Sequence, residues 1–190
     1  MGDRVLPPLL LSERRSPATR GLTTCKPWLT YDACTIYEEG HTAGLTFKIE
    51  IDAPPGQVFS HLEDVATHPS WSNPKANMTM EQTAGAGPGA DARYRSSGVF
   101  VGKPVTADIT VTAYEPPRRF AIRSDQHQEG KKDVWYLNDY TLSPANGCTV
   151  VTKHVTSNGN PAIFYLAYPA VRADAMTSLR NLKRVSESGS

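Results

Sequence analysis

The stretch that decides the fold is Pro161–Glu187, with the sequence PAIFYLAYPAVRADAMTSLRNLKRVSE. Its apolar residues recur every three or four positions, the spacing of one face of an α-helix. A helix of about 25 residues spans about 38 Å, and Pro169 should kink or break it near its start. The sequence therefore predicts one long amphipathic helix whose apolar face needs a large partner surface. The stripe consists of Phe164, Tyr168, Val171, Ala175, Leu179 and Leu182.

The chain before this helix supplies a partner surface in the form of strands. Apolar residues alternate with polar ones in Thr42–Asp52 and Val105–Tyr114, which is typical of strands with one buried face. Because short turns rich in Gly, Pro and Asn separate the strands, the sheet should be antiparallel. The other strands are expected at residues 77–83, 92–97, 120–124, 132–142 and 148–156.

Two short helices are expected between the first two strands. Pro54-Pro55 favours a helix start, since proline is tolerated in a first turn. His68-Pro69-Ser70-Trp71 should break or bend the second helix, because a residue before proline is pushed out of the α region. The whole order predicts an α+β fold, in which a curved antiparallel sheet of six or seven strands wraps around the C-terminal helix and leaves a space between them.

Residues 1–41 follow a different pattern from the rest. They contain Pro7-Pro8, Pro17, Gly21 and Pro27 and show no strand or helix period of any length. We therefore expect a flexible N-terminal extension at 1–41 and a single domain at 42–187.

Composition excludes several kinds of partner. A net charge of +1 gives no basic field for nucleic acid, and no apolar run is long enough for integral membrane association.

The three cysteines, Cys25, Cys34 and Cys148, lack CxxC spacing. This argues against a disulfide framework or a zinc site and favours a reducing, cytoplasmic setting. The glycine run at 85–89 lies between two strands and lacks phosphate-loop spacing, so a turn is expected there and no cofactor is expected. The sequence gives no indication of the oligomeric state.

Five motifs in order carry a resemblance to a known superfamily. Together they cover about residues 45–187 and resemble START lipid-transfer domains, birch-pollen-allergen-like proteins and bacterial polyketide cyclases, the SRPBCC superfamily. The chain is most similar to the bacterial polyketide cyclase/dehydrase branch, which implies the helix-grip fold. It departs from that branch at Ala53-Pro54-Pro55, where the family usually has a Ser or Thr cap, and residues 1–44 have no counterpart. The motifs are Ile51–Phe59, His68–Trp71, Gly87–Arg95, Val111–Phe120, and Tyr140–Pro144 with Gly147–Val150.

The resemblance leaves three functions open, because members of this superfamily carry lipids, cyclise polyketides or bind hormones. The first is the binding of a small hydrophobic molecule, lipid- or polyketide-like, in a cavity between the sheet and the C-terminal helix. The second is a polyketide cyclase, aromatase or dehydratase. The third is an interaction module in which side chains fill that space. The first is preferred, since few ionisable groups fall on the apolar faces of the strands.

The alternation of side chains selects the residues expected to line the cavity. If Tyr140 and Leu142 face inward, Tyr136 and Asn138 on the same strand do so as well. On the following strand the inward set is then Val150, Thr152 and His154, and Tyr94 and Ser96 form the inward pair of a third strand. A single bulge would reverse such an assignment. The candidate ligand-binding residues are Trp71, Tyr94, Tyr136, Asn138, Tyr140, Thr152, His154, Phe164 and Tyr168.

His154 is the candidate catalytic residue for the cyclase alternative. An imidazole titrates near neutrality and can act as a general acid or base on a carbon acid. The opposing interpretation is a strand histidine that is exposed or satisfied by a neighbouring hydroxyl. His61 and His68 lack ligand spacing to a carboxylate or cysteine, so a metal site is not expected.

Overall fold

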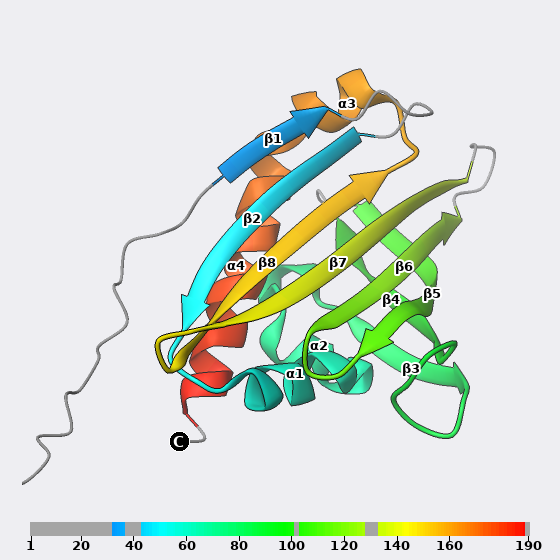
Figure 1. The fold of residues 1–190 in the computed structure, drawn as a ribbon. Helices are drawn as coiled ribbons and strands as arrows, with labels where there is room; N and C mark the ends of the chain where they lie inside the picture. Colours follow the sequence, from blue (N-terminus) through cyan, green and yellow to red (C-terminus); the bar gives the residue numbers. More distant parts are fainter. Residues whose placement is uncertain (1–31, 37–42, 101–102, 128–132, 189–190) are drawn as a thin grey trace, which may run out of the picture.

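The structure, a computed structural model, describes residues 32–36, 43–100, 103–127 and 133–188. These residues form one curved antiparallel sheet with helices on its concave side (Figure 1). The strand order is β1-β2-β8-β7-β6-β5-β4-β3. The strands are β1 Asp32–Ile36, β2 Ala43–Ile51, β3 Thr79–Ala84, β4 Arg93–Phe100, β5 Lys103–Glu115, β6 Arg119–His127, β7 Val134–Ala145 and β8 Cys148–Ser157.

Strands β2–β8 confirm the predicted antiparallel sheet of the helix-grip fold. The eighth strand, β1, pairs with the edge of β2 and lies inside the segment that was expected to be an extension. The rest of that segment, residues 1–31 and 37–41, lies outside the described residues.

The predicted short helices lie between β2 and β3. They are α1 (Pro55–Glu63) and α2 (His68–Trp71), accompanied by the 3₁₀ turns η1 (Val65–Thr67) and η2 (Pro74–Ala76). Helix α1 begins at Pro55 without a side-chain cap, and the Pro54 carbonyl accepts the hydrogen bonds from Gln57 N and Val58 N that close its first turn.

The C-terminal helix is interrupted where proline predicted a break. Helix α3 (Pro161–Leu166) and helix α4 (Tyr168–Glu187) meet at Ala167, and Pro169 lies in the first turn of α4, where a missing N–H has no intrahelical partner to lose. The Asn160 side chain caps α3 by accepting a 2.9 Å hydrogen bond from Ala162 N.

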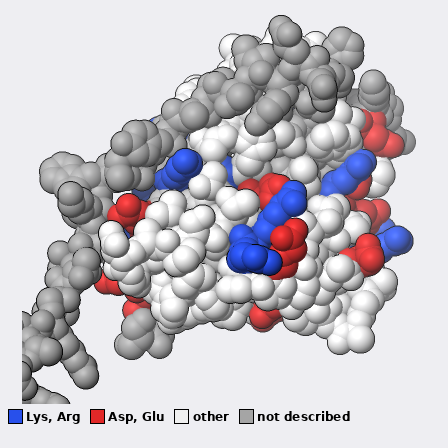
Figure 2. Space-filling model, viewed as in Figure 1, with Lys and Arg blue, Asp and Glu red and all other residues white. Residues whose placement is uncertain are grey.

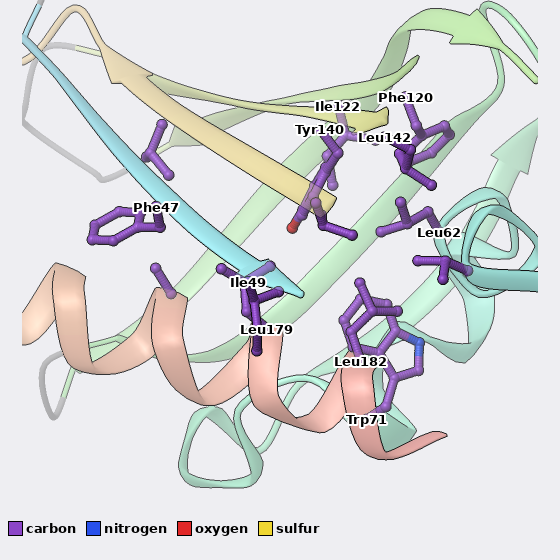
Figure 3. Packing of buried hydrophobic residues seen from close by; sticks show 14 of the residues in the cluster. Phe47, Ile49, Leu62, Trp71, Phe120, Ile122, Tyr140, Leu142, Leu179 and Leu182 are labelled. Carbon is purple, nitrogen blue, oxygen red and sulfur yellow. The ribbon is translucent and has the colours of Figure 1, made fainter. Parts of the chain in front are cut away.

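The sheet and α4 bury their apolar faces against one another. Leu45, Phe47, Ile49 and Ile51 of β2 are buried while Lys48 between them is exposed, as their alternation predicted. Figure 3 shows Leu179 of α4 pointing towards β2 beside Ile49. Register shifts at Gln82/Ala84 of β3 and Val111/Ala113 of β5 add local bends to the sheet.

Figure 2 shows basic and acidic side chains beside one another in small groups, as expected for a chain of nearly zero net charge. No described helix has the length and apolar character needed to cross a bilayer.

Cys148 is disulfide-bonded, so the expectation that the cysteines remain reduced is wrong for this residue.

Candidate functional site

A cavity of about 200 Å³ lies between the sheet and the helices α2 and α4. A smaller hollow of about 150 Å³ adjoins it and shares several lining residues, so that the two together fall at the lower end of the range of ligand pockets, about 300–1,000 Å³. Most of the wall is apolar and comes from β3–β7 and α2. Its apolar and aromatic residues are Trp71, Ala76, Met78, Met80, Val99, Val105, Ala107, Ile109, Ile122 and Tyr140.

Lys153 of β8 is the charged residue of the sheet wall. It is only 5% exposed and lines both hollows. Its Nζ lies 5.3 Å from the ring centroid of Tyr140, the residue paired with it on β7. Among the described residues, Lys153 Nζ has no hydrogen bond or ion pair. Figure 3 shows the Tyr140 hydroxyl directed from the sheet towards the helix layer.

His68, the first residue of α2, contributes a neutral imidazole to the wall. Its Nε2 lies 2.8 Å from the Leu62 carbonyl oxygen, which can only accept, so Nε2 carries the proton and Nδ1 is left as an acceptor. Burial lowers the pKa of His68 to about 4; the bond to Leu62 opposes this shift and the nearby positive charge of Lys153 adds to it. The ring packs 4.6 Å from the ring of Trp71.

Asp174 of α4 is the acidic residue of the cavity. Its Oδ1 accepts a 2.7 Å hydrogen bond from Asn73 Nδ2, which fixes the carboxylate against the chain that follows α2. Both residues line the cavity, and Asp174 lines the smaller hollow as well. A neutral imidazole, an ammonium and a carboxylate therefore face one space whose remaining walls are largely apolar. Besides Asn73, its uncharged polar residues are Ser72, Ser96, Ser97, Ser124, Gln126, Asn138 and Ser178.

The structure brings together four of the nine candidate residues. Trp71, Asn138 and Tyr140 line the cavity, and Tyr136 and Asn138 line the smaller hollow. Burial raises the pKa of the Tyr136 hydroxyl, and a hydrogen bond with Ser157 opposes that shift.

Three other candidates pack in or against the hydrophobic core and line neither hollow. Tyr94 is 3% exposed, and burial is the main cause that raises its pKa, followed by the charge of Asp64. Phe164 of α3 is buried in the same core, and Tyr168 of α4 packs against it from a partly buried position.

The predicted orientation of Thr152 and His154 is wrong, because both side chains lie on the outer face of the sheet. The β7–β8 hairpin turns on Asn146 and Gly147, with φ of 49° and 87°. This two-residue turn pairs Tyr140 with Lys153, so the inward residues of β8 are Val151, Lys153 and Val155. The predicted alternation of side chains along β8 was correct, but the residues assigned to its inward face are those of the outer face.

His154 forms a hydrogen bond outside the cavity, on the outer face of the sheet. Its Nδ1 lies 2.8 Å from Thr46 Oγ1 of the neighbouring strand β2. Burial lowers its pKa, and the charge of Asp139 opposes this shift. The imidazole is therefore remote from any molecule held between the sheet and α4.

The sequence did not predict Lys153 and Asp174 as cavity residues, and it indicated His68 only as part of a helix bend. The signal for Lys153 was present in Asn146-Gly147, because a two-residue turn fixes which residues of the two strands face the same side. Asp174 had no comparable signal, since its position opposite Lys153 depends on how α4 lies across the sheet.

Comparison with protein families gives one extended match. The family described as "Polyketide cyclase / dehydrase and lipid transport" matches residues 42–187. No curated protein matches the chain by sequence.

Solved structures share the architecture at low sequence identity. The Zhui aromatase/cyclase from a Streptomyces species is 14% identical with a TM-score of 0.62, over 77% of this chain and 94% of that one. A protein of Thermus thermophilus is 18% identical with a TM-score of 0.62, over 77% and 99% of the two chains. The major latex-like protein 151 of Panax ginseng is 13% identical with a TM-score of 0.59, over the same shares. At this identity the likeness concerns the fold.

Proposed function

Because the chain belongs to the polyketide cyclase/dehydrase and lipid-transport family, we propose that it binds a small hydrophobic molecule in the cavity between the sheet and α4. The observation that carries the proposal is the cavity itself. Its wall is mainly apolar, it adjoins a second hollow, and it interrupts a core in which residues such as Leu179 and Phe120 are almost completely buried. A lipid- or polyketide-like body suits such a wall because it gains hydrophobic burial there.

The two alternatives have less support. An interaction module would have side chains filling the space, whereas this interior retains a cavity of about 200 Å³. The cyclase hypothesis assigned acid–base chemistry to His154, which lies on the outer face beside Thr46. We therefore do not retain His154 as an acid–base residue.

A cavity-filling substitution tests the proposal. The neutral fluorescent probe N-phenyl-1-naphthylamine should bind the unchanged protein with increased emission. Ala107→Phe should weaken that binding about tenfold or more, because Ala107 is buried in the β5 wall and a ring added there occupies ligand volume. Fluorescence titration measures both.

The matched control is Thr110→Phe, which adds the same ring to the same strand on the outer face. Thr110 pairs with Arg93 and Arg123, whose side chains are exposed. This variant should bind the probe like the unchanged protein. If the two variants lose binding equally, or if the unchanged protein does not bind, the cavity is not the binding site.

A further inference from the structure

We infer that the ligand carries one anionic oxygen group, such as a carboxylate, that binds Lys153 Nζ at the sheet wall; this inference rests on the proposed function. The first support is the burial of Lys153. It is the only lysine or arginine that is buried among the described residues, and it lies on a strand whose inward neighbours are Val151 and Val155. An ammonium removed from bulk water is costly unless an opposite charge or several acceptors compensate it.

The second support is that no acidic side chain among the described residues forms an ion pair with this ammonium, although Asp174 lines the same cavity. Three arginines of the outer surface are paired, with Arg95 on Asp108, Arg119 on Asp139 and Arg123 on Asp125 at 2.7–2.8 Å. Lys153 has no such partner among the residues that the structure describes; its contact is with the face of the Tyr140 ring. A ligand oxyanion would supply the missing acceptor.

The third support comes from the other titratable groups that face the cavity. His68 is neutral at pH 7, since its pKa lies near 4, so it adds no second positive charge. Asp174 faces the same space from α4 and would repel an anion placed near the helix. Among the described lining residues, the favourable place for an anionic group is therefore the β8 wall, and a ligand with two anionic ends would meet Asp174. These groups together favour a monoanion with an apolar body.

Two compounds of nearly equal shape test the inference. 2-Naphthoate carries a carboxylate where 2-acetonaphthone carries a neutral acetyl group. Displacement of N-phenyl-1-naphthylamine at pH 7.5 gives the affinity of each. The unchanged protein should prefer 2-naphthoate, and Lys153→Met should weaken its binding about tenfold or more while leaving 2-acetonaphthone within about twofold, because only the carboxylate uses the charge.

Two further variants test whether the effect is specific to Lys153 and whether a negative charge in the cavity opposes binding. Lys48→Met removes an exposed lysine from the outer face of β2 and should leave both affinities unchanged. Asp174→Asn should strengthen 2-naphthoate binding a few-fold, because it removes the like charge and retains an oxygen that can accept from Asn73.

The outcomes separate this inference from the proposed function. Failure of the unchanged protein to bind N-phenyl-1-naphthylamine overturns the proposed function. If the probe binds but the ratio of the two affinities is the same with and without Lys153, the inference alone is overturned. Should Lys153→Met fail to fold, Lys153→Gln takes its place, with the same loss expected for 2-naphthoate and the same unchanged ratio overturning the inference.

Discussion

Leu179→Ala should lower the free energy of unfolding by about 2–5 kcal/mol, the range for a buried leucine that leaves a cavity. Leu179 is 1% exposed and lies in the middle of α4, where it faces β2 (Figure 3). The loss has two sources, the transfer free energy of the removed carbons and the contacts that the neighbouring core side chains no longer make. Urea denaturation, followed by circular dichroism, measures the change.

Leu166→Ala is the matched control for this substitution. Leu166 ends helix α3 and is 84% exposed, so the same chemical change should alter stability by less than about 0.5 kcal/mol. A change below about 0.5 kcal/mol for Leu179→Ala as well would contradict the packing of α4 against the concave face.

Acidification from pH 7.5 to pH 4 should cost the protein about 3 kcal/mol of stability through His68 alone. Its pKa is about 4 in the folded chain and 6.5, the ordinary value, when unfolded. The unfolded chain therefore binds more protons between these values, and stability falls as the pH decreases, by at most about 1.4 kcal/mol per pH unit. Above pH 7.5 the residue is neutral in both states and contributes no pH dependence.

A non-titrating variant isolates this contribution. His68→Gln should show a shallower decline in urea-denaturation stability between pH 7.5 and pH 4 than the unchanged protein. His154, whose pKa burial also lowers, contributes in the same direction and remains in both proteins. Parallel declines would contradict the burial of a neutral His68. An NMR titration of the folded protein gives a second measure, in which the His68 ring signals should stay constant down to about pH 5.

The fold could be predicted from the sequence because it depends on local periods. The alternation around Leu45–Ile51 identified β2, and the three- and four-residue spacing of the C-terminal stripe identified α4. Pro169 placed the break before α4 within two residues of Ala167, where it occurs. These signals lie within single segments, so no knowledge of tertiary packing was needed to interpret them.

The cavity was harder to predict because it depends on how segments face one another. The orientation of β7 was correct for Asn138, Tyr140 and Leu142, yet the next strand was assigned the wrong phase. The reason is geometrical: residues that pair across a two-residue hairpin turn share a face, and Tyr140 pairs with Lys153 rather than with a residue beside it. This error replaced the buried cation with His154 and so changed the chemistry expected inside the cavity.

The juxtaposition of His68, Lys153 and Asp174 could not be derived from sequence. The three residues come from α2, β8 and α4, and their meeting depends on the curvature of the sheet and the path of α4 across it. Nor could the neutral state of His68 be derived, since its cause is burial against side chains from other elements.

Binding in the cavity between the sheet and α4 can be located directly by NMR. The signals of the isoleucine δ1-methyl groups are followed while N-phenyl-1-naphthylamine is added. Ile109 and Ile122 line the cavity, whereas Ile163 is 66% exposed on α3. Because the ring-current shifts of an aromatic probe fall off steeply with distance, the signals of Ile109 and Ile122 should move to saturation and that of Ile163 should not. If the signal of Ile163 shifts to saturation while those of Ile109 and Ile122 do not move, the probe binds the surface. That result would contradict the proposal that this protein binds its ligand in the cavity between the sheet and α4.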